Sequence, residues 1–387
     1  MTSSLACFLL STCLLLLAAG VVRFSPFYAD LVRHAHVRYL PLDGLRGFLA
    51  LGVFFHHAVV FYFFYVTGKW QVPPSVFYTL LGQIAVSLFF MITGFLFWSK
   101  AIQTRGKVNP IKLLQSRLRR LVPMYVVSVL LVFGVAFIAS GLMLRSSYPD
   151  LANQMLRWMS FGFMDLPDVN GLKKSWIINS VYWTLRYEWL FYLLLPFIAW
   201  AYRDVAFVVL ALVAGTLVLT LHGHIVLLSF VFGAVTAWLS SKNIIWLMRL
   251  AQSRLAAVGV FAILALLFWR LDTAYTLRAG AMLFVVFFIL AAGNSLFGLL
   301  VSAPARLLGA TSYSLYLLHS PILFLVLYFV NRWTPIASLD ALSYWSVVGL
   351  AGCLLVLAAA LTFRWVEYPF MSQRRVVLSS STAAIAA

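Results

Sequence analysis

The chain has 387 residues, of which 64% are hydrophobic and 10% charged, and its formal net charge is +18. This composition excludes a soluble enzyme domain and predicts an all-α protein that crosses the membrane many times. A charge of this size would indicate nucleic acid in a soluble protein, but here the basic residues gather between apolar runs, as positive-inside topology requires. We therefore expect a lipid bilayer, and no nucleic acid, as the partner of these charges.

Residues 5–22 form the first apolar run that is long enough to span a membrane. No basic residue precedes the run, whereas Arg23, Arg33 and Arg38 follow it. This order argues against a cleaved signal peptide and favours a retained helix whose N-terminus lies outside. We assign residues 1–37 to this extra helix and a cytoplasmic linker.

The second run, residues 42–65, predicts a membrane-spanning helix with Arg46 in its first turn and His56 and His57 near its middle. Arg46 and His57 are eleven residues apart, about three turns at roughly 3.6 residues per turn, so they share one face. Their separation along the axis is about 16 Å, which places His57 near mid-bilayer, and His56 points about 100° away. An ionisable group at that depth is costly and predicts a functional site. The alternative for Arg46 alone is an anchor among the lipid head groups.

The remaining apolar runs complete a bundle of about eleven spans. They are expected at residues 76–98, 121–142, 182–202, 205–221, 225–240, 255–270, 277–297, 313–330 and 344–364. The densest basic stretch, Lys100 to Arg120, is expected to be a cytoplasmic loop, and the long polar segment at about 143–182 should be external. The C-terminus is then cytoplasmic, and residues 371–387 should be a disordered tail.

Two arginines in the basic stretch are candidates for binding an anion. Arg117 and Arg120 are three apart, so they share a face where a helix enters the membrane. This geometry suits a phosphate-bearing cytoplasmic donor. Topology alone is the alternative, because a positive-inside loop needs no ligand.

Glu188 is the candidate carboxylate. It lies one turn into a helix, among the aromatic residues Trp183 and Tyr187, and Arg186 projects from the opposite side. A carboxylate there would orient a histidine or bind a sugar hydroxyl. The alternative is an interfacial carboxylate in an aromatic belt.

A last pair, Tyr316 and His319, are three apart and share a helical face, where a structural interhelical histidine is an equally good interpretation. The chain has no nucleotide-binding glycine motif, zinc signature or Gly-x-Ser-x-Gly elbow. Its three cysteines lie in apolar runs without companion histidines, so we expect neither disulfides nor a metal site.

Taken in order, these segments resemble the acyltransferase-3 family of integral membrane O-acyltransferases. The matching residues are Leu42–Gly47 with His57, Ser87–Phe90 with Gly94–Leu96, Arg117–Pro123, Trp183–Leu185 with Glu188 and Phe191–Tyr192, Ser312–Tyr316 with His319 and Pro321, and Glu367 with Pro369. The similarity covers about residues 38–370. Thr93 stands where the family usually has serine, and the helix before residue 23 is extra to the usual ten-helix core.

The resemblance implies transfer of an acyl group, usually acetyl, from cytoplasmic acyl-CoA to a hydroxyl of a cell-surface or lipid-linked carbohydrate, such as O-antigen or exopolysaccharide, at the bacterial inner membrane. Acetyl-CoA is then the co-substrate. The implied catalytic residues are His57, Glu188 and Arg46; the donor would be held by Arg46, Arg117 and Arg120, and the acceptor by Trp183, Tyr187, Tyr316 and His319.

Within this hypothesis an internal cavity surrounds His57, which acts as general base on the acceptor hydroxyl or carries the acyl group transiently. The alternative is a non-enzymatic transporter or flippase of an anionic glycolipid, with Arg46 and His57 lining its path.

Overall fold

The computed structural model describes residues 4–34, 39–200 and 225–371, and within these ranges the chain is built from helices without a strand. The helices are α1 (Ser4–Phe24), α2 (Pro26–His34), α3 (Leu40–Thr67), α4 (Val76–Gln103), α5 (Pro110–Ala139), α6 (Tyr148–Trp158), α7 (Tyr182–Trp200), α9 (Leu228–Ser241), α10 (Ile245–Gln252), α11 (Arg254–Arg270), α12 (Leu277–Ala291), α13 (Ala303–Ala310), α14 (Ser312–Trp333) and α15 (Ala341–Thr362). A π-helical segment, η6 (Phe363–Glu367), continues α15. The predicted all-α class is confirmed.

Six of these helical segments are long and apolar enough to cross a membrane, or up to seven if the bent pair of α9 and α10 counts as one span. They are α1, α3, α4, α5, α14 and the continuous segment Ala341–Met371. This number does not confirm the predicted eleven spans. The predicted span at 205–221 and nearly all of the predicted tail, residues 372–387, lie outside the described residues.

The basic stretch differs most from its prediction. We expected a loop from Lys100 to Arg120, but α5 already begins at Pro110. The Asn109 side chain caps the helix by accepting a hydrogen bond of 2.9 Å from the Lys112 backbone N–H, and a proline suits the first helical position. Arg117 and Arg120 are therefore held on a helix, and the connecting loop is short.

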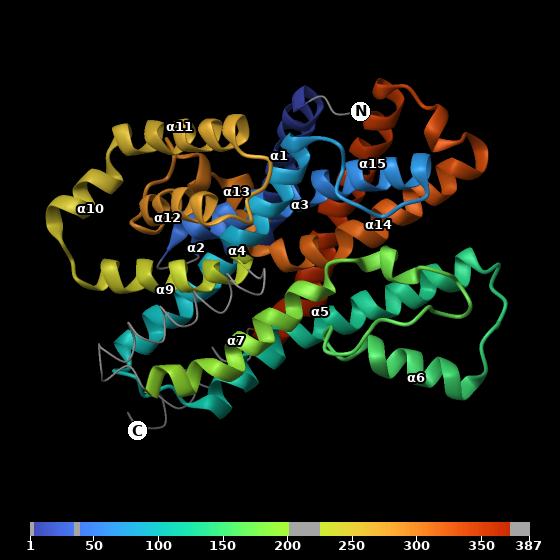
Figure 1. Ribbon diagram of the computed structural model, residues 1–387, viewed down its shortest axis with the longest axis horizontal. Helices are drawn as coiled ribbons and strands as arrows, with labels where there is room; N and C mark the ends of the chain where they lie inside the picture. Colours follow the sequence, from blue (N-terminus) through green and yellow to red (C-terminus); the bar gives the residue numbers. More distant parts are fainter. Residues whose placement is uncertain (1–3, 35–38, 201–224, 372–387) are drawn as a thin grey trace.

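Helix α3 lies at the centre of the bundle, in contact with α4, α13 and α14 (Figure 1). In the most apolar stretches of α3 and α4, 61% and 72% of the residues are buried, against 17% in α1. Helix α1 lies outside this centre and packs on α13 and α15. Both Arg46 and His57 are thus carried by one of the best-enclosed helices.

Glycines let α3 and α13 approach closely. A Cβ atom on Gly309 of α13 would overlap the backbone oxygen of Asp43, and one on Gly44 would overlap that of Leu300. A second close crossing joins α4 and α9 through Gly94 and Gly233, which each lie against the backbone of the other helix. Small residues at such crossings let backbones pack directly, as is common between membrane helices.

Candidate active site

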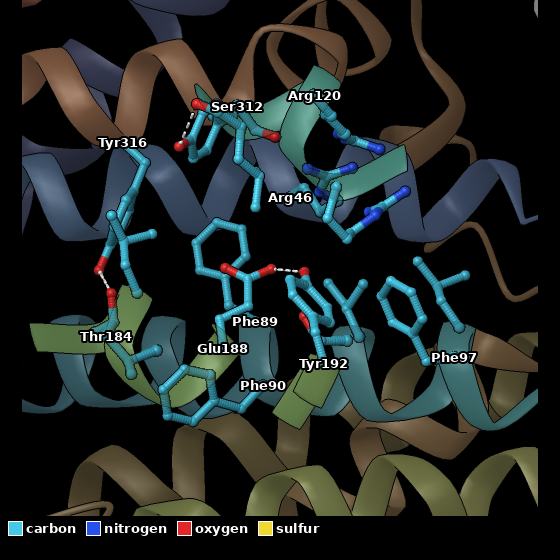
Figure 2. A pocket seen from close by; sticks show the side chains of 18 residues that line it. Arg46, Phe89, Phe90, Phe97, Arg120, Thr184, Glu188, Tyr192, Ser312 and Tyr316 are labelled. Carbon is cyan, nitrogen blue, oxygen red and sulfur yellow. Dashed lines mark hydrogen bonds between the residues drawn. The ribbon is translucent and has the colours of Figure 1, made fainter. Parts of the chain in front are cut away.

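A pocket opens beside the first turns of α3, between α4, α5, α7 and α14 (Figure 2). We call it the arginine pocket, since three arginines line it: Arg46 from α3 and Arg117 and Arg120 from α5. The other polar lining residues are Thr93, Thr184, Glu188, Tyr192, Ser312, Tyr313 and Tyr316. Three guanidinium groups face one carboxylate, so the pocket favours a negatively charged ligand.

Two polar atoms of this pocket have no hydrogen-bond partner within the described structure: the buried Nε of Arg117 and the buried Oγ of Ser312. The Arg117 guanidinium lies over the rings of Phe97, at 5.0 Å, and Tyr192, at 5.9 Å. These contacts fix its position, and one terminal nitrogen donates to the Ser116 hydroxyl at 3.4 Å, but Nε–H is left free. An unmet buried donor is costly unless a ligand or water satisfies it.

A second, more basic cavity shares two residues with the arginine pocket. Lys112, Gln115, Ser116 and Arg119 line it together with Arg117 and Arg120. The two cavities therefore meet along one face of α5, as the spacing of Arg117 and Arg120 predicts. A ligand with several phosphates would find cations along the whole of this face.

Glu188 projects into the arginine pocket, across from Arg46 and Arg120 in Figure 2. Its carboxylate accepts a hydrogen bond from the Tyr192 hydroxyl, one turn further along α7. His57 does not line this pocket. Glu188 therefore lies in the wall of the arginine pocket and not against His57.

A second group of polar residues, the histidine cluster, consists of His57, His319, Ser180 and Trp70. His319 Nε2 lies 3.1 Å from His57 Nδ1, and the Ser180 hydroxyl lies 3.3 Å from His57 Nε2. The Trp70 ring stacks on His57 at 6.2 Å between centroids. His56 turns away and contacts the Tyr78 carbonyl through Nδ1 at 2.8 Å, in agreement with the predicted divergence of the two side chains.

The segment that carries Ser180 is fixed by its neighbour Asn179. This buried side chain donates hydrogen bonds of 2.9 Å to the Leu317 carbonyl oxygen of α14 and to the Ser128 hydroxyl of α5. Ser180 is the C-cap residue of the short helix η1 (Ser175–Asn179) and lies two residues before α7. Its hydroxyl is thereby held against His57.

Tyr316 links the two regions. Its hydroxyl hydrogen-bonds the Thr184 hydroxyl at 2.8 Å inside the arginine pocket (Figure 2), while its carbonyl oxygen lies 2.7 Å from His319 Nδ1. The sequence led us to expect the cavity around His57. Instead, the described pocket is lined from the Arg46 end of α3, and Tyr316 stands at its boundary with the histidine cluster.

The remaining predicted acceptor residues, Trp183 and Tyr187, do not line either cavity. Trp183 is 42% exposed, and its ring lies 6.0 Å from that of Tyr187. Thr184, Glu188 and Tyr192 follow one another at intervals of four, which is the helical face of α7 that meets the pocket. Extending this interval from Glu188 would have identified Thr184 and Tyr192, which the sequence interpretation missed.

The histidine cluster also contains residues that sequence spacing could not connect. Ser180 lies 123 residues from His57 along the chain, and Trp70 lies in the non-helical segment after α3; only the fold brings both against the His57 ring. Across the described ranges, no group of three or more histidine, cysteine or acidic residues is arranged to hold a metal ion.

Comparison with known proteins identifies related sequences. A family model for an acyltransferase domain, acyltransferase-3, matches residues 40–364, so the match begins at α3 and leaves α1 and α2 outside. The exopolysaccharide production protein ExoZ of Rhizobium meliloti is 28% identical over 258 residues, 62% of this chain and 76% of the relative.

For two further relatives, the alignment with this chain covers a smaller share of the relative. The O-acetyltransferase OatA of Staphylococcus aureus is 25% identical over 380 residues, which are 86% of this chain but 57% of the relative. The acyltransferase MdmB of Streptomyces mycarofaciens is 32% identical over 170 residues, 41% of this chain and 39% of the relative. No solved structure matches.

Proposed function

The chain belongs to the acyltransferase-3 family, and from this premise we propose that it transfers an acyl group, acetyl in the simplest case, from cytoplasmic acyl-CoA to a hydroxyl of a cell-surface or lipid-linked carbohydrate. The names of two relatives, an O-acetyltransferase and an exopolysaccharide production protein, support the reaction and the class of acceptor. The observation that carries the proposal is the arginine pocket with its unpartnered donors, which Tyr316 joins to the histidine cluster.

The donor is the part for which the structure gives most support. Arg117 and Arg120 line both cavities, with Lys112 and Arg119 in the second one, so the phosphates of acyl-CoA would be held along this face of α5. The aromatic lining of the arginine pocket would contact the pantetheine arm. Arg46, which lies beside Arg120 in Figure 2, would hold the donor together with the α5 cations.

The chemical step falls to His57. A neutral imidazole can remove the proton of an acceptor hydroxyl as that oxygen attacks the acyl carbon. The C–S bond then breaks, and the proton ends on the CoA thiol. Glu188 would bind a hydroxyl of the acceptor or position the donor, because it faces the pocket and not the imidazole.

Topology follows from the same proposal. The basic first turns of α5 would face the cytoplasm of a bacterial cell, with the protein in the inner membrane, its N-terminus outside and its C-terminus inside. In this orientation donor phosphates enter from the side where acyl-CoA is made. The acceptor would reach His57 from the other side of the membrane.

The test is mass analysis of surface and lipid-linked glycans from a deletion strain that is complemented with wild type or with His57→Ala. We expect an acetyl-sized mass that is lost on deletion and restored only by wild type, provided that both proteins are present in membranes. Restoration by His57→Ala would overturn the catalytic assignment. Unchanged acylation with undecorated glycolipid retained on the cytoplasmic side would instead identify a flippase.

A further inference from the structure

The histidine cluster contains a detail that the proposed function does not yet use: the two imidazoles contact each other, and carbonyl oxygens lie against both. His319 Nδ1 lies 2.7 Å from the Tyr316 carbonyl oxygen, and His57 Nδ1 lies 3.1 Å from that of Val53. A carbonyl oxygen can only accept a hydrogen bond. These contacts therefore decide which ring nitrogens carry protons.

Consider His319 first. Its side chain is fully buried, and a charged ring in the membrane interior is costly, so it is taken as neutral with a single N–H. That N–H is Nδ1–H, which donates to the Tyr316 carbonyl oxygen. His319 Nε2 therefore has a free lone pair and presents it to His57 Nδ1 at 3.1 Å.

His57 follows from this assignment. Its Nδ1 faces two acceptors, the Val53 carbonyl oxygen and His319 Nε2, each at 3.1 Å. Nδ1 must therefore carry the proton of a neutral ring, and Nε2 is left as the proton acceptor. The Ser180 hydroxyl donates to this Nε2 over 3.3 Å and marks the direction in which a substrate hydroxyl would lie.

From this geometry we propose that His319 is a positioning residue for acyl transfer: it holds His57 in the tautomer whose Nε2 acts as the base. This proposal rests on the proposed function and gives His319 a role different from direct acceptor binding. A side chain that accepts from Nδ1 of a catalytic histidine fixes its tautomer and ring orientation, as the third member of a nucleophile–base–orienting group does. Here an imidazole, itself fixed by a backbone carbonyl, would replace the usual carboxylate.

The experiment uses membrane vesicles that contain the full chain, with radiolabelled acetyl-CoA, and follows label transferred to the endogenous glycan. His319→Leu removes the acceptor, whereas His319→Gln can offer an amide oxygen close to the position of Nε2. We expect His319→Leu to lower the maximal rate about 10- to 100-fold at unchanged KM for acetyl-CoA, and His319→Gln to retain most of the lost rate. His56→Gln is the matched control, because the His56 ring also lies against His57, at 5.0 Å between centroids, but hydrogen-bonds the Tyr78 carbonyl oxygen and neither nitrogen of His57; it should keep most of the wild-type rate.

Three outcomes would overturn the proposal. A wild-type rate in His319→Leu shows that the residue is dispensable, equal defects in both variants indicate packing, and a change in KM alone indicates a binding contact. If the wild-type protein transfers no label, the proposed function itself is wrong. If the wild type transfers label and His57→Ala does not, the proposed function stands, and the His319 variants then test the role of His319 alone.

A measurement on the unmodified histidine pair covers the case in which both variants misfold. Nitrogen-15 NMR of histidine-labelled wild-type protein in nanodiscs reports which nitrogen of each ring is protonated, and the His57 signals are identified by their loss in His57→Gln. We expect a protonated Nδ1 and a free Nε2 on His57. A protonated Nε2 and a free Nδ1 on His57 would overturn the proposal, whatever the rates of the variants.

Discussion

The arginine pocket and the histidine cluster are both built on α3, yet their polar groups are satisfied in opposite ways. In the pocket, the Nε of Arg117 and the Oγ of Ser312 lack a partner among the described residues. In the cluster, both ring nitrogens of His57 and of His319 have a neighbour at hydrogen-bond distance. The difference separates two tasks: one region awaits the charge of a ligand, and the other holds protons at fixed atoms.

If the two tasks are separate, the largest effect should come from the base. His57→Ala should lower the maximal rate of acetyl transfer by about 10²- to 10⁴-fold, the usual contribution of general acid–base catalysis. The KM for acetyl-CoA should stay near its wild-type value, since His57 does not line the arginine pocket. Kinetics in vesicles, normalised to the amount of protein in the membrane, measure both. A raised KM for acetyl-CoA with an unchanged maximal rate would show that His57 binds the donor and that the two regions form one binding site.

The complementary change is Arg117→Ala. It removes a buried charge that would contact a donor phosphate, and a hydrogen bond to a charged group contributes about 1.5–3 kcal/mol. We expect the KM for acetyl-CoA to rise about 10- to 100-fold with a smaller change in maximal rate. Lys107→Ala is the control, because Lys107 is exposed in the same basic stretch and lines neither cavity. Equal effects of the two variants would show that Arg117 acts only through the overall positive charge of the basic stretch and not through a specific contact with the donor.

A smaller effect is expected where the regions meet. Tyr316→Phe keeps the ring but removes the hydroxyl that bonds Thr184, and Thr184→Val removes the other partner. Each should lower the rate several-fold, as expected for one neutral hydrogen bond of about 0.5–1.5 kcal/mol. The double variant should be no worse than either single one if both act through this bond. Fully additive losses would show that Tyr316 and Thr184 act independently.

The smallest effect should come from Asp340, which belongs to neither region. It caps α15 by accepting a hydrogen bond of 2.7 Å from the Ser343 backbone N–H, and this bond lowers the pKa of the Asp340 carboxyl below its ordinary value. A lowered folded-state pKa means that the stabilisation is present above the unfolded pKa and is lost as pH falls through the folded one.

Asp340→Ala should therefore lower the melting temperature slightly at neutral pH, by on the order of 1 °C, and not at all in strong acid. Thermal unfolding of both proteins across pH measures this, with acetyl transfer unchanged. A difference of the same size that persists in strong acid would mean that the charge of the carboxylate is not its source.

Sequence patterns were sufficient for the elements and for single-helix geometry. Long apolar runs predicted α1, α3, α4 and α14 to within a few residues, and a period of 3.6 predicted which residues of one helix share a face. The same period placed Arg117 and Arg120 side by side. These inferences need only the geometry of one helix.

Contacts between helices were not predictable in the same way. All faces of a membrane helix are apolar, so hydrophobic periodicity does not show which face meets which neighbour. The contact of His57 with His319 and the position of Tyr316 at the pocket boundary depend on how α3 and α14 cross. The early start of α5 was not predicted, because the basic residues around Asn109 are typical of a cytoplasmic loop. The helix begins there because the Asn109 side chain caps it.

The glycine crossing of α3 and α13 has a consequence for how a substrate gains access. With the backbones of Asp43 and Gly309 in direct contact, neither helix can turn or slide without a collision, so the two form a fixed frame. The other wall of the arginine pocket is α7, which packs on α4 and α5, and its pocket-facing contacts there are made by side chains such as Tyr192. Side-chain contacts yield by rotamer changes where backbone contacts do not. We therefore expect the side chains of α7, such as Tyr192, to move when a substrate enters, because the Asn179 hydrogen bonds hold the segment before this helix against α5 and α14.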